Sequence, residues 1–135
     1  MTKKKFTQDP YLESARNAFR QNELARAEDF IKASIEANST NPIAHAYYGE
    51  ILLALGRPEE AGDSYQLATD ICPKEGTFWH GLGLAKFRAG SLGAGINALR
   101  CAIELMPSNP EVHNNLGNFQ KETGNLRDAV FSYKR

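Results

Sequence analysis

Apolar residues along most of the chain recur at the three- and four-residue spacing of an amphipathic helix, as in Leu92, Ile96, Leu99 and Ile103. The two-residue alternation that marks a half-buried strand appears nowhere in the sequence. We therefore expect an all-α fold. The pattern predicts helices over residues 10–21, 24–37, 42–55, 58–71, 76–89, 92–105 and 110–123, with an eighth helix beginning near residue 126.

The helical pattern repeats every 34 residues without an insertion. A shift by this period places Pro42 on Gly76 and then on Pro110. We expect one domain over residues 8–135, preceded by a disordered basic N-terminus over residues 1–7. Its predicted repeats are 8–41, 42–75, 76–109 and 110–135, of which the last is truncated.

Two columns of the repeat contain residues with special backbone properties. Glycine costs about 0.5–1 kcal/mol in a helix interior, so its recurrence there indicates close helix–helix contact. That first column is Ala15, Gly49, Gly83 and Gly117. A second column contains Asn or Gly, which best tolerate the left-handed conformation that ends a helix. It is Asn22, Gly56, Gly90 and Gly124, and it predicts a turn in every repeat.

These residues resemble the tetratricopeptide repeat (TPR) family, whose pattern includes W-x2-L-G, A-x3-F and a proline. The matching residues are Trp79, Leu82 and Gly83, the pairs Ala61–Tyr65 and Ala129–Tyr133, and Pro73 and Pro107. The resemblance implies a right-handed α-solenoid of stacked antiparallel helix pairs, about three and three-quarter repeats long. The first repeat departs from the pattern, with Ser14–Ala15 for Leu–Gly and Ser39 for the proline.

Composition and charge restrict the class of partner. The chain has 16 Lys and Arg against 16 Asp and Glu, so it lacks the positive field that drives nucleic-acid binding. A hydrophobic content of 41% fits a folded soluble protein rather than a membrane-inserted one. The two cysteines fit a reducing compartment. We expect a cytoplasmic protein with no nucleic-acid partner and no membrane insertion.

No catalytic motif is present. The sequence lacks G-x-S-x-G, G-x-x-x-x-G-K-[ST] and H-E-x-x-H. His45, His80 and His113 lie in different repeats, too far apart to bind one ion, and are expected to be structural or to line the groove. Cys72 and Cys101 have no basic neighbours that would activate a thiolate. We expect no catalytic, cofactor-binding or metal-binding residue, and hence no enzyme.

The resemblance places a concave groove along one face of the first helix of each repeat, where family members commonly hold a peptide or a partner helix. Aromatic, aliphatic and amide groups share this face, a mixture that suits a polypeptide. Function would then be that of a protein–protein interaction scaffold; an idle solvated face is the alternative. The predicted groove residues are Leu12, Glu13, Arg16, Phe19, Tyr47, Glu50, Leu53, Thr77, His80, Leu84, Phe87, Arg88, Glu111, Asn114, Asn115, Asn118 and Lys121, with Tyr47, Leu84 and Asn115 as anchors.

Two narrower family resemblances concern the ligand. TPR proteins that hold acidic chaperone tails use a clamp of Lys and Asn, whereas the matching places here are Leu12, Arg16, Tyr47, Thr77 and Gly81, or, one repeat later, Ala46, Glu50, Gly81, Glu111 and Asn115. Neither set supplies the clamp. The run Asn114–Asn118 resembles part of the asparagine ladder of N-acetylglucosamine transferases. The alternative function is therefore a regulatory or targeting arm of a larger glycosyl- or sulfotransferase.

The C-terminal repeat lacks the second half of its final helix. Repeat arrays generally need a terminal helix with a polar outer face. Leu116, Phe119, Val130 and Tyr133 would otherwise form an apolar end surface. We therefore expect that the chain is a fragment, and that it frays from about residue 126 or self-associates through this end.

Overall fold

The computed structural model describes the backbone of residues 9–133 and the side chains of residues 9–124. Within this range all regular structure is helical, which confirms the all-α prediction. The helices are α1 (Pro10–Arg20), α2 (Leu24–Ala37), α3 (Pro42–Ala54), α4 (Pro58–Ile71), α5 (Gly76–Arg88), α6 (Leu92–Leu105) and α7 (Pro110–Tyr133). The predicted basic N-terminus, residues 1–7, lies outside the described residues.

Asp or Asn side chains cap the N-terminal ends of α1, α3 and α7. Asp9 Oδ1 accepts a hydrogen bond from the Leu12 amide at 3.0 Å, and Asn41 Oδ1 accepts one from Ile43 at 3.0 Å. These side chains satisfy amide groups that the first helical turn leaves free. Asn109 caps α7 in the same way, through the Glu111 and Val112 amides. The repeat in the sequence therefore fixes where α1, α3 and α7 begin.

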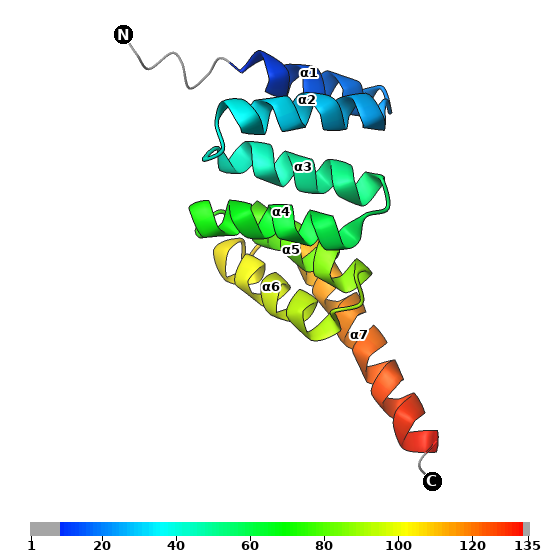
Figure 1. Ribbon diagram of the computed structural model, residues 1–135. Coiled ribbons are helices and arrows are strands. Elements are labelled where there is room, and N and C mark those ends of the chain that lie inside the picture. The colour runs from blue at the N-terminus through cyan, green and yellow to red at the C-terminus, as the bar shows by residue number, and fades with distance from the viewer. Residues whose placement is uncertain (1–8, 134–135) are drawn as a thin grey trace.

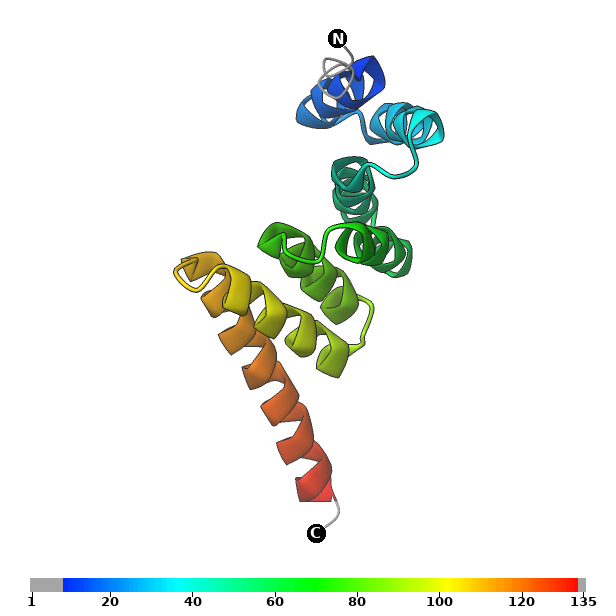
Figure 2. The same ribbon diagram turned by 90° about the vertical axis from the view of Figure 1, so that its left-hand side faces the viewer.

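Three tight turns convert the helices into antiparallel pairs. Asn22 has a φ of 60°, and Gly56 and Gly90 have φ values of 78° and 93°. A side chain with a Cβ adopts this left-handed conformation only at a cost, which explains Asn and Gly in this column. The resulting hairpins α1–α2, α3–α4 and α5–α6 stack one after another, and α7 packs on α6 (Figures 1 and 2).

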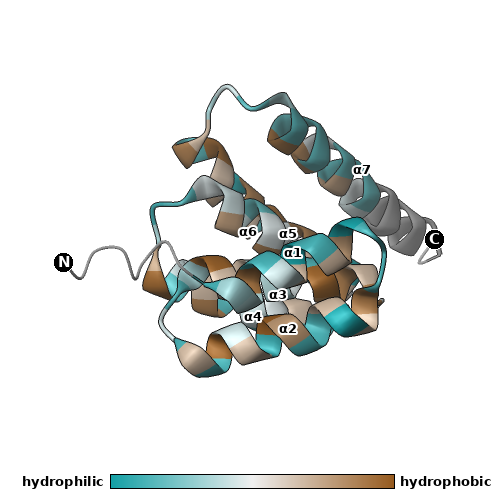
Figure 3. Cartoon of the chain, turned by 90° about the horizontal axis from the view of Figure 1, so that it is seen from above, coloured by the Kyte–Doolittle hydropathy of each residue, from teal (hydrophilic) through white to brown (hydrophobic). Residues whose placement is uncertain are grey.

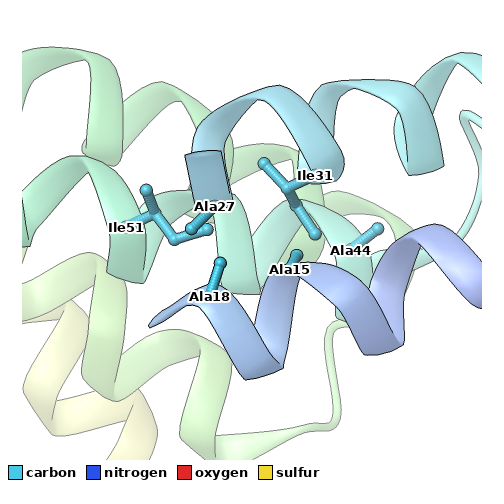
Figure 4. Close-up of a cluster of buried hydrophobic side chains, with 6 residues drawn as sticks. All are labelled: Ala15, Ala18, Ala27, Ile31, Ala44 and Ile51. Carbon is cyan, nitrogen blue, oxygen red and sulfur yellow. The ribbon is translucent and has the colours of Figure 1, made fainter. Parts of the chain in front are cut away.

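Small residues allow the helices to approach closely. The first core cluster is largely alanine, and Figure 4 shows its side chains converging from the first three helices. It consists of Ala15, Ala18, Ala27, Ile31, Ala44 and Ile51, which are all buried. In the next hairpin the Tyr65 ring occupies the space beside Gly49, where a Cβ would come within 2.6 Å of the ring. Leu99 stands against Gly83 similarly, at 2.7 Å. Gly49 and Gly83 are therefore packing positions, as the sequence predicts, whereas a Cβ at Gly117, in the same column, would have no described atom within 4 Å.

A polar network joins the first hairpin to the second. Glu28 of α2 accepts hydrogen bonds from Tyr48 of α3 and from Arg57, just before α4, at 3.1 and 3.0 Å. The Arg57 guanidinium also binds the Glu60 carboxylate at 2.7 Å. The pKa of Glu28 is lowered, chiefly because its charged form accepts the Arg57 hydrogen bond. This contact fixes α2 relative to α3 and α4 from outside the alanine-rich core.

The expected turn at Gly124 and the separate helix from residue 126 are wrong. α7 continues without interruption from Pro110 to Tyr133, and its second half extends beyond the stacked hairpins (Figure 1). Glycine permits a left-handed turn but does not impose one; continuing a helix through it costs only about 1 kcal/mol. The turns at Gly56 and Gly90 are each followed by a helix that packs back on the preceding one. Packing of the second helix, rather than the glycine, therefore decides whether the chain turns.

Candidate binding face

The residues that the sequence selects as the groove lie on α1, α3 and α5, the first helices of the three hairpins, and on α7. We call these residues the first-helix face. Every one of them is exposed or half-buried. Contacts link the helices in series: α3 touches α5, and side chains connect α1 to α3 and α5 to α7. Along the described part of α7, hydrophilic residues predominate, with a few hydrophobic ones between them (Figure 3). The structure thus brings residues from distant repeats onto one continuous row.

At its N-terminal end, this face is centred on Tyr47 of α3. The Phe19 ring lies 5.7 Å from the Tyr47 ring at an angle of 60°, and the Arg16 guanidinium carbon lies 5.8 Å from the Tyr47 ring centre. Burial raises the pKa of Tyr47, and the nearby Glu50 adds to the shift while Arg16 opposes it. These four side chains form an amphipathic cluster with apolar ring surface, a phenol and both signs of charge.

The centre of the face contains a residue that sequence reasoning missed. Tyr65 belongs to α4, a second helix, but its ring packs beside Gly49 of α3 and Gly81 of α5. Burial raises the pKa of Tyr65 strongly, the charge of Glu50 raises it further, and Arg88 opposes both. The Tyr65 ring therefore extends between α3 and α5. It lies near the charged groups of Glu50 and Arg88, which belong to the predicted groove residues. The sequence contains a signal for this contact, because glycines on two successive first helices leave room for a ring from a neighbouring helix.

At the C-terminal end, the face is built by α5 and α7. The Asn115 side-chain amide donates a hydrogen bond to Nε2 of His80, 2.9 Å away, so this imidazole is neutral with Nε2 as acceptor. Burial lowers the pKa of His80, and the Glu111 carboxylate partly opposes that shift. Asn115 is thus both a predicted anchor and a link between two repeats.

Several of the predicted groove residues also pack against neighbouring side chains. The Phe87 ring stacks on Phe119 of α7 with ring centres 3.7 Å apart and an interplanar angle of 2°, so one ring face is covered. Leu12, Leu53 and Leu84 are half-buried against the three core clusters. The exposed positions of the predicted set are Glu13, Glu50, Thr77, Arg88, Glu111, Asn114, Asn118 and Lys121. Polar groups therefore form the outer layer of the face, and apolar groups form its floor.

Two of the histidines have a structural partner. Nε2 of His45 donates to the Ser39 carbonyl, and Nε2 of His113 donates to the Pro107 carbonyl, both at 2.8 Å. Cys72 and Cys101 are free thiols and half-buried. Among residues 9–124, whose side chains are described, no three His, Cys, Asp or Glu side chains gather as metal ligands would. No helix within residues 9–133 is both long enough and apolar enough to cross a membrane.

Stacked antiparallel helix pairs with a continuous first-helix face define a helical-repeat protein. Residues 12–75 match the family model described as tetratricopeptide repeat, and the same 34-residue pattern continues through the following repeats. Residues 12–75 are therefore a tetratricopeptide repeat segment, and the described chain has the fold of TPR domains. A search of curated proteins found no match.

Solved TPR structures share the fold at low sequence identity. The Sgt2 TPR domain from Aspergillus fumigatus has a TM-score of 0.85 and 22% identity, over 89% of this chain and 81% of that one. The first TPR of Spaghetti (RPAP3), bound to the HSP90 peptide SRMEEVD, has a TM-score of 0.82 and 20% identity, over 84% and 90%. The Yersinia enterocolitica type III secretion chaperone SycD, in complex with a peptide of the translocator YopD, has a TM-score of 0.78 and 19% identity, over 87% and 95%.

Proposed function

We propose that this protein is a protein–protein interaction module that binds an extended or helical segment of a partner along the first-helix face. The observation that carries the proposal is the cluster of Arg16, Phe19, Tyr47 and Glu50, which offers apolar ring surface next to both signs of charge. A polypeptide needs this combination, because its side chains require apolar contacts while its backbone and charged groups require polar ones. The peptide-bound structures of similar fold support a ligand of this class.

Residues farther along the face provide the polar groups for a backbone. Asn114 and Asn118 of α7 are exposed amides, and Arg88 of α5 is an exposed cation. Amide side chains both donate and accept hydrogen bonds, so they can pair with peptide groups of either polarity. A partner segment lying along the row would meet aromatic surface near α1 and α3 and amides near α7. Because the two ends of the row differ in this way, we expect the partner segment to bind in one preferred direction.

The affinity should be moderate. A face with few aromatic anchors fits a dissociation constant of about 1 μM, or about −8 kcal/mol. The test begins with affinity capture of partners on the immobilised chain and continues with calorimetry on the segment of a captured partner that binds. Charge reversal at the exposed positions Glu50→Lys and Arg88→Glu should weaken binding about tenfold or more each. Tyr47→Ala should weaken it further, with helicity checked by circular dichroism.

Matched controls lie on the second helices. Ile71 of α4 and Leu105 of α6 are exposed hydrophobic residues outside the first-helix face, with exposed fractions of 41% and 39%. Their replacement by alanine should leave affinity unchanged. Loss of binding in these two variants, together with full binding in the Glu50→Lys and Arg88→Glu variants, would assign the partner to the second-helix surface instead.

A further inference from the structure

The hairpins pair their two helices in one fixed register. The Tyr65 ring packs on Gly49 and the Leu99 side chain packs on Gly83, and each contact joins residues sixteen positions apart. Ala15 and Ile31, also sixteen positions apart, share the first core cluster. A small residue on the first helix and a large one sixteen residues later therefore form the contact that closes each hairpin.

The last repeat contains the same pair of residues without the hairpin. Gly117 and Tyr133 are again sixteen positions apart, but both belong to the uninterrupted helix α7. Sixteen residues of straight helix span about 24 Å, so Tyr133 does not reach Gly117 of its own copy. Accordingly, a Cβ added to Gly117 would have no described atom within 4 Å. The small-residue position on α7 is present but uncovered.

A cavity lies beside the uncovered part of α7. It has a volume of about 500 Å³ and lies between α6 and α7. Its lining residues are Gly93, Ile96, Asn97, Arg100, Gln120, Thr123 and Gly124. The corresponding cavity one repeat earlier, between α4 and α5, is about 210 Å³ and is bordered by Ser91, where the chain turns into α6. The absence of a returning helix thus coincides with a larger open volume.

We propose that α7 pairs with α7 of a second copy of this chain, in an antiparallel dimer whose twofold axis passes near residue 125. Gly117 stands eight residues before that position and Tyr133 eight residues after it. The axis therefore places Tyr133 of the partner subunit on Gly117, and the reverse contact follows by symmetry. The sixteen-residue pairing seen in the hairpins then forms twice in the dimer, once on each copy, and α7 remains straight.

Energetics favour an occupant for this surface. A helix draws most of its stability from tertiary packing, and α7 extends beyond the hairpins that pack the other helices (Figure 2). Each copy supplies one Gly117 and one Tyr133, so the proposed contact is self-complementary. The formal net charge of zero imposes no overall repulsion between copies. A second copy of this chain is therefore the partner that we propose for this surface.

The first test is the mass of the 135-residue chain by sedimentation equilibrium at tens of micromolar, where a dimer is expected. Gly117→Leu fills a position that is open in the single chain, so it should keep the helical circular dichroism signal but yield a monomer. Tyr133→Ala should also yield a monomer. Glu122→Ala, at an exposed position on a different face of the same helix, should remain dimeric. A monomeric wild-type chain, or a dimer that Gly117→Leu and Tyr133→Ala leave intact, would overturn the proposal.

The second test separates pairing between copies from closure of one chain on itself. In a background with Cys72→Ser and Cys101→Ser, one copy carries Gly117→Cys and a tagged copy carries Tyr133→Cys. A disulfide between the two copies supports the proposal. A chain carrying both cysteines that forms only an internal disulfide contradicts it, as does the absence of any cross-link.

Discussion

The indole Nε1 of Trp79 donates a hydrogen bond to the carbonyl oxygen of Pro73, 2.8 Å away, and so ties the first turns of α5 to the loop before it. His45 and His113 stand one repeat before and after Trp79 and bind the carbonyl six residues upstream at the same distance. His45, Trp79 and His113 thus share a ring N–H donor, whereas the first repeat has Tyr11 in the same column.

This role predicts the effect of Trp79→Phe, which keeps an aromatic ring but removes the donor. We expect a loss of about 1–2 kcal/mol in the free energy of unfolding, from one hydrogen bond and a smaller apolar surface. Urea unfolding followed by circular dichroism measures it. Tyr11→Phe, at a residue that is 45% exposed, should change stability by less than about 0.5 kcal/mol. Equal stability of the Trp79→Phe variant and the wild type would show that the hydrogen bond contributes nothing net.

Gly81 should be intolerant of a side chain. A Cβ at this position would overlap the Tyr65 ring, which is buried and held against Gly49 on its other side. Gly81→Ala should therefore destabilise the protein by about 1–3 kcal/mol, in spite of the higher helix propensity of alanine. Gly93→Ala is the matched control, because a Cβ there would have no described atom within 4 Å. Urea midpoints should fall for Gly81→Ala and stay level or rise for Gly93→Ala.

Much of this fold follows from local signals in the sequence. The bounds of α2, α4 and α6 are as predicted, and α1, α3 and α5 each end one residue earlier than predicted. Caps and left-handed turn residues act within a few positions, so a reader of the sequence can place them. The straight α7 could not be placed this way, because Gly124 allows both a turn and a helix and the choice depends on packing.

The candidate face was less accessible to prediction. The positions that periodicity selects on these helices are exposed or half-buried, but periodicity could not show which of them also pack against neighbours. Phe87 is partly covered by Phe119, and Asn115 is bonded to His80. Tyr65 enters the sequence analysis only as a motif residue, although its ring lies against Gly49 of its own hairpin and Gly81 of the next one. Contacts between repeats depend on side-chain length and direction, and a one-dimensional pattern contains neither. The binding role of the face stays a prediction.

Acidification should weaken the contact between α5 and α7. The pKa of His80 is lowered from its ordinary value near 6.5, so folding favours the neutral ring that accepts the Asn115 hydrogen bond. The stabilisation is complete above pH 6.5 and is lost as pH falls through the lowered pKa. Because His80 is half-exposed, the effect should be below about 1 kcal/mol. His80→Gln does not titrate, so the wild type should lose more stability than this variant between pH 7 and pH 5. Parallel pH profiles would exclude His80 as the source.

The last prediction concerns acidic chaperone tails. The structure of similar fold that contains an HSP90 peptide makes such a tail an obvious test ligand. By resemblance, the residues at the places of the family's cationic clamp are Leu12, Arg16, Tyr47, Thr77 and Gly81, or, one repeat later, Ala46, Glu50, Gly81, Glu111 and Asn115.

Of these positions, only Arg16 is cationic, and its guanidinium lies over the Tyr47 ring and within 3.9 Å of the Glu13 carboxylate. Glu50 adds a further negative charge near Tyr47, which would repel an acidic terminus. Calorimetry with a peptide ending in SRMEEVD should therefore show no saturable binding at concentrations up to about 100 μM, where a micromolar ligand would saturate. The variant Glu50→Lys removes the repulsion and should bind the peptide better than the wild type does. Saturable micromolar binding by the unmodified chain would show that the face recognises acidic tails through residues other than the clamp.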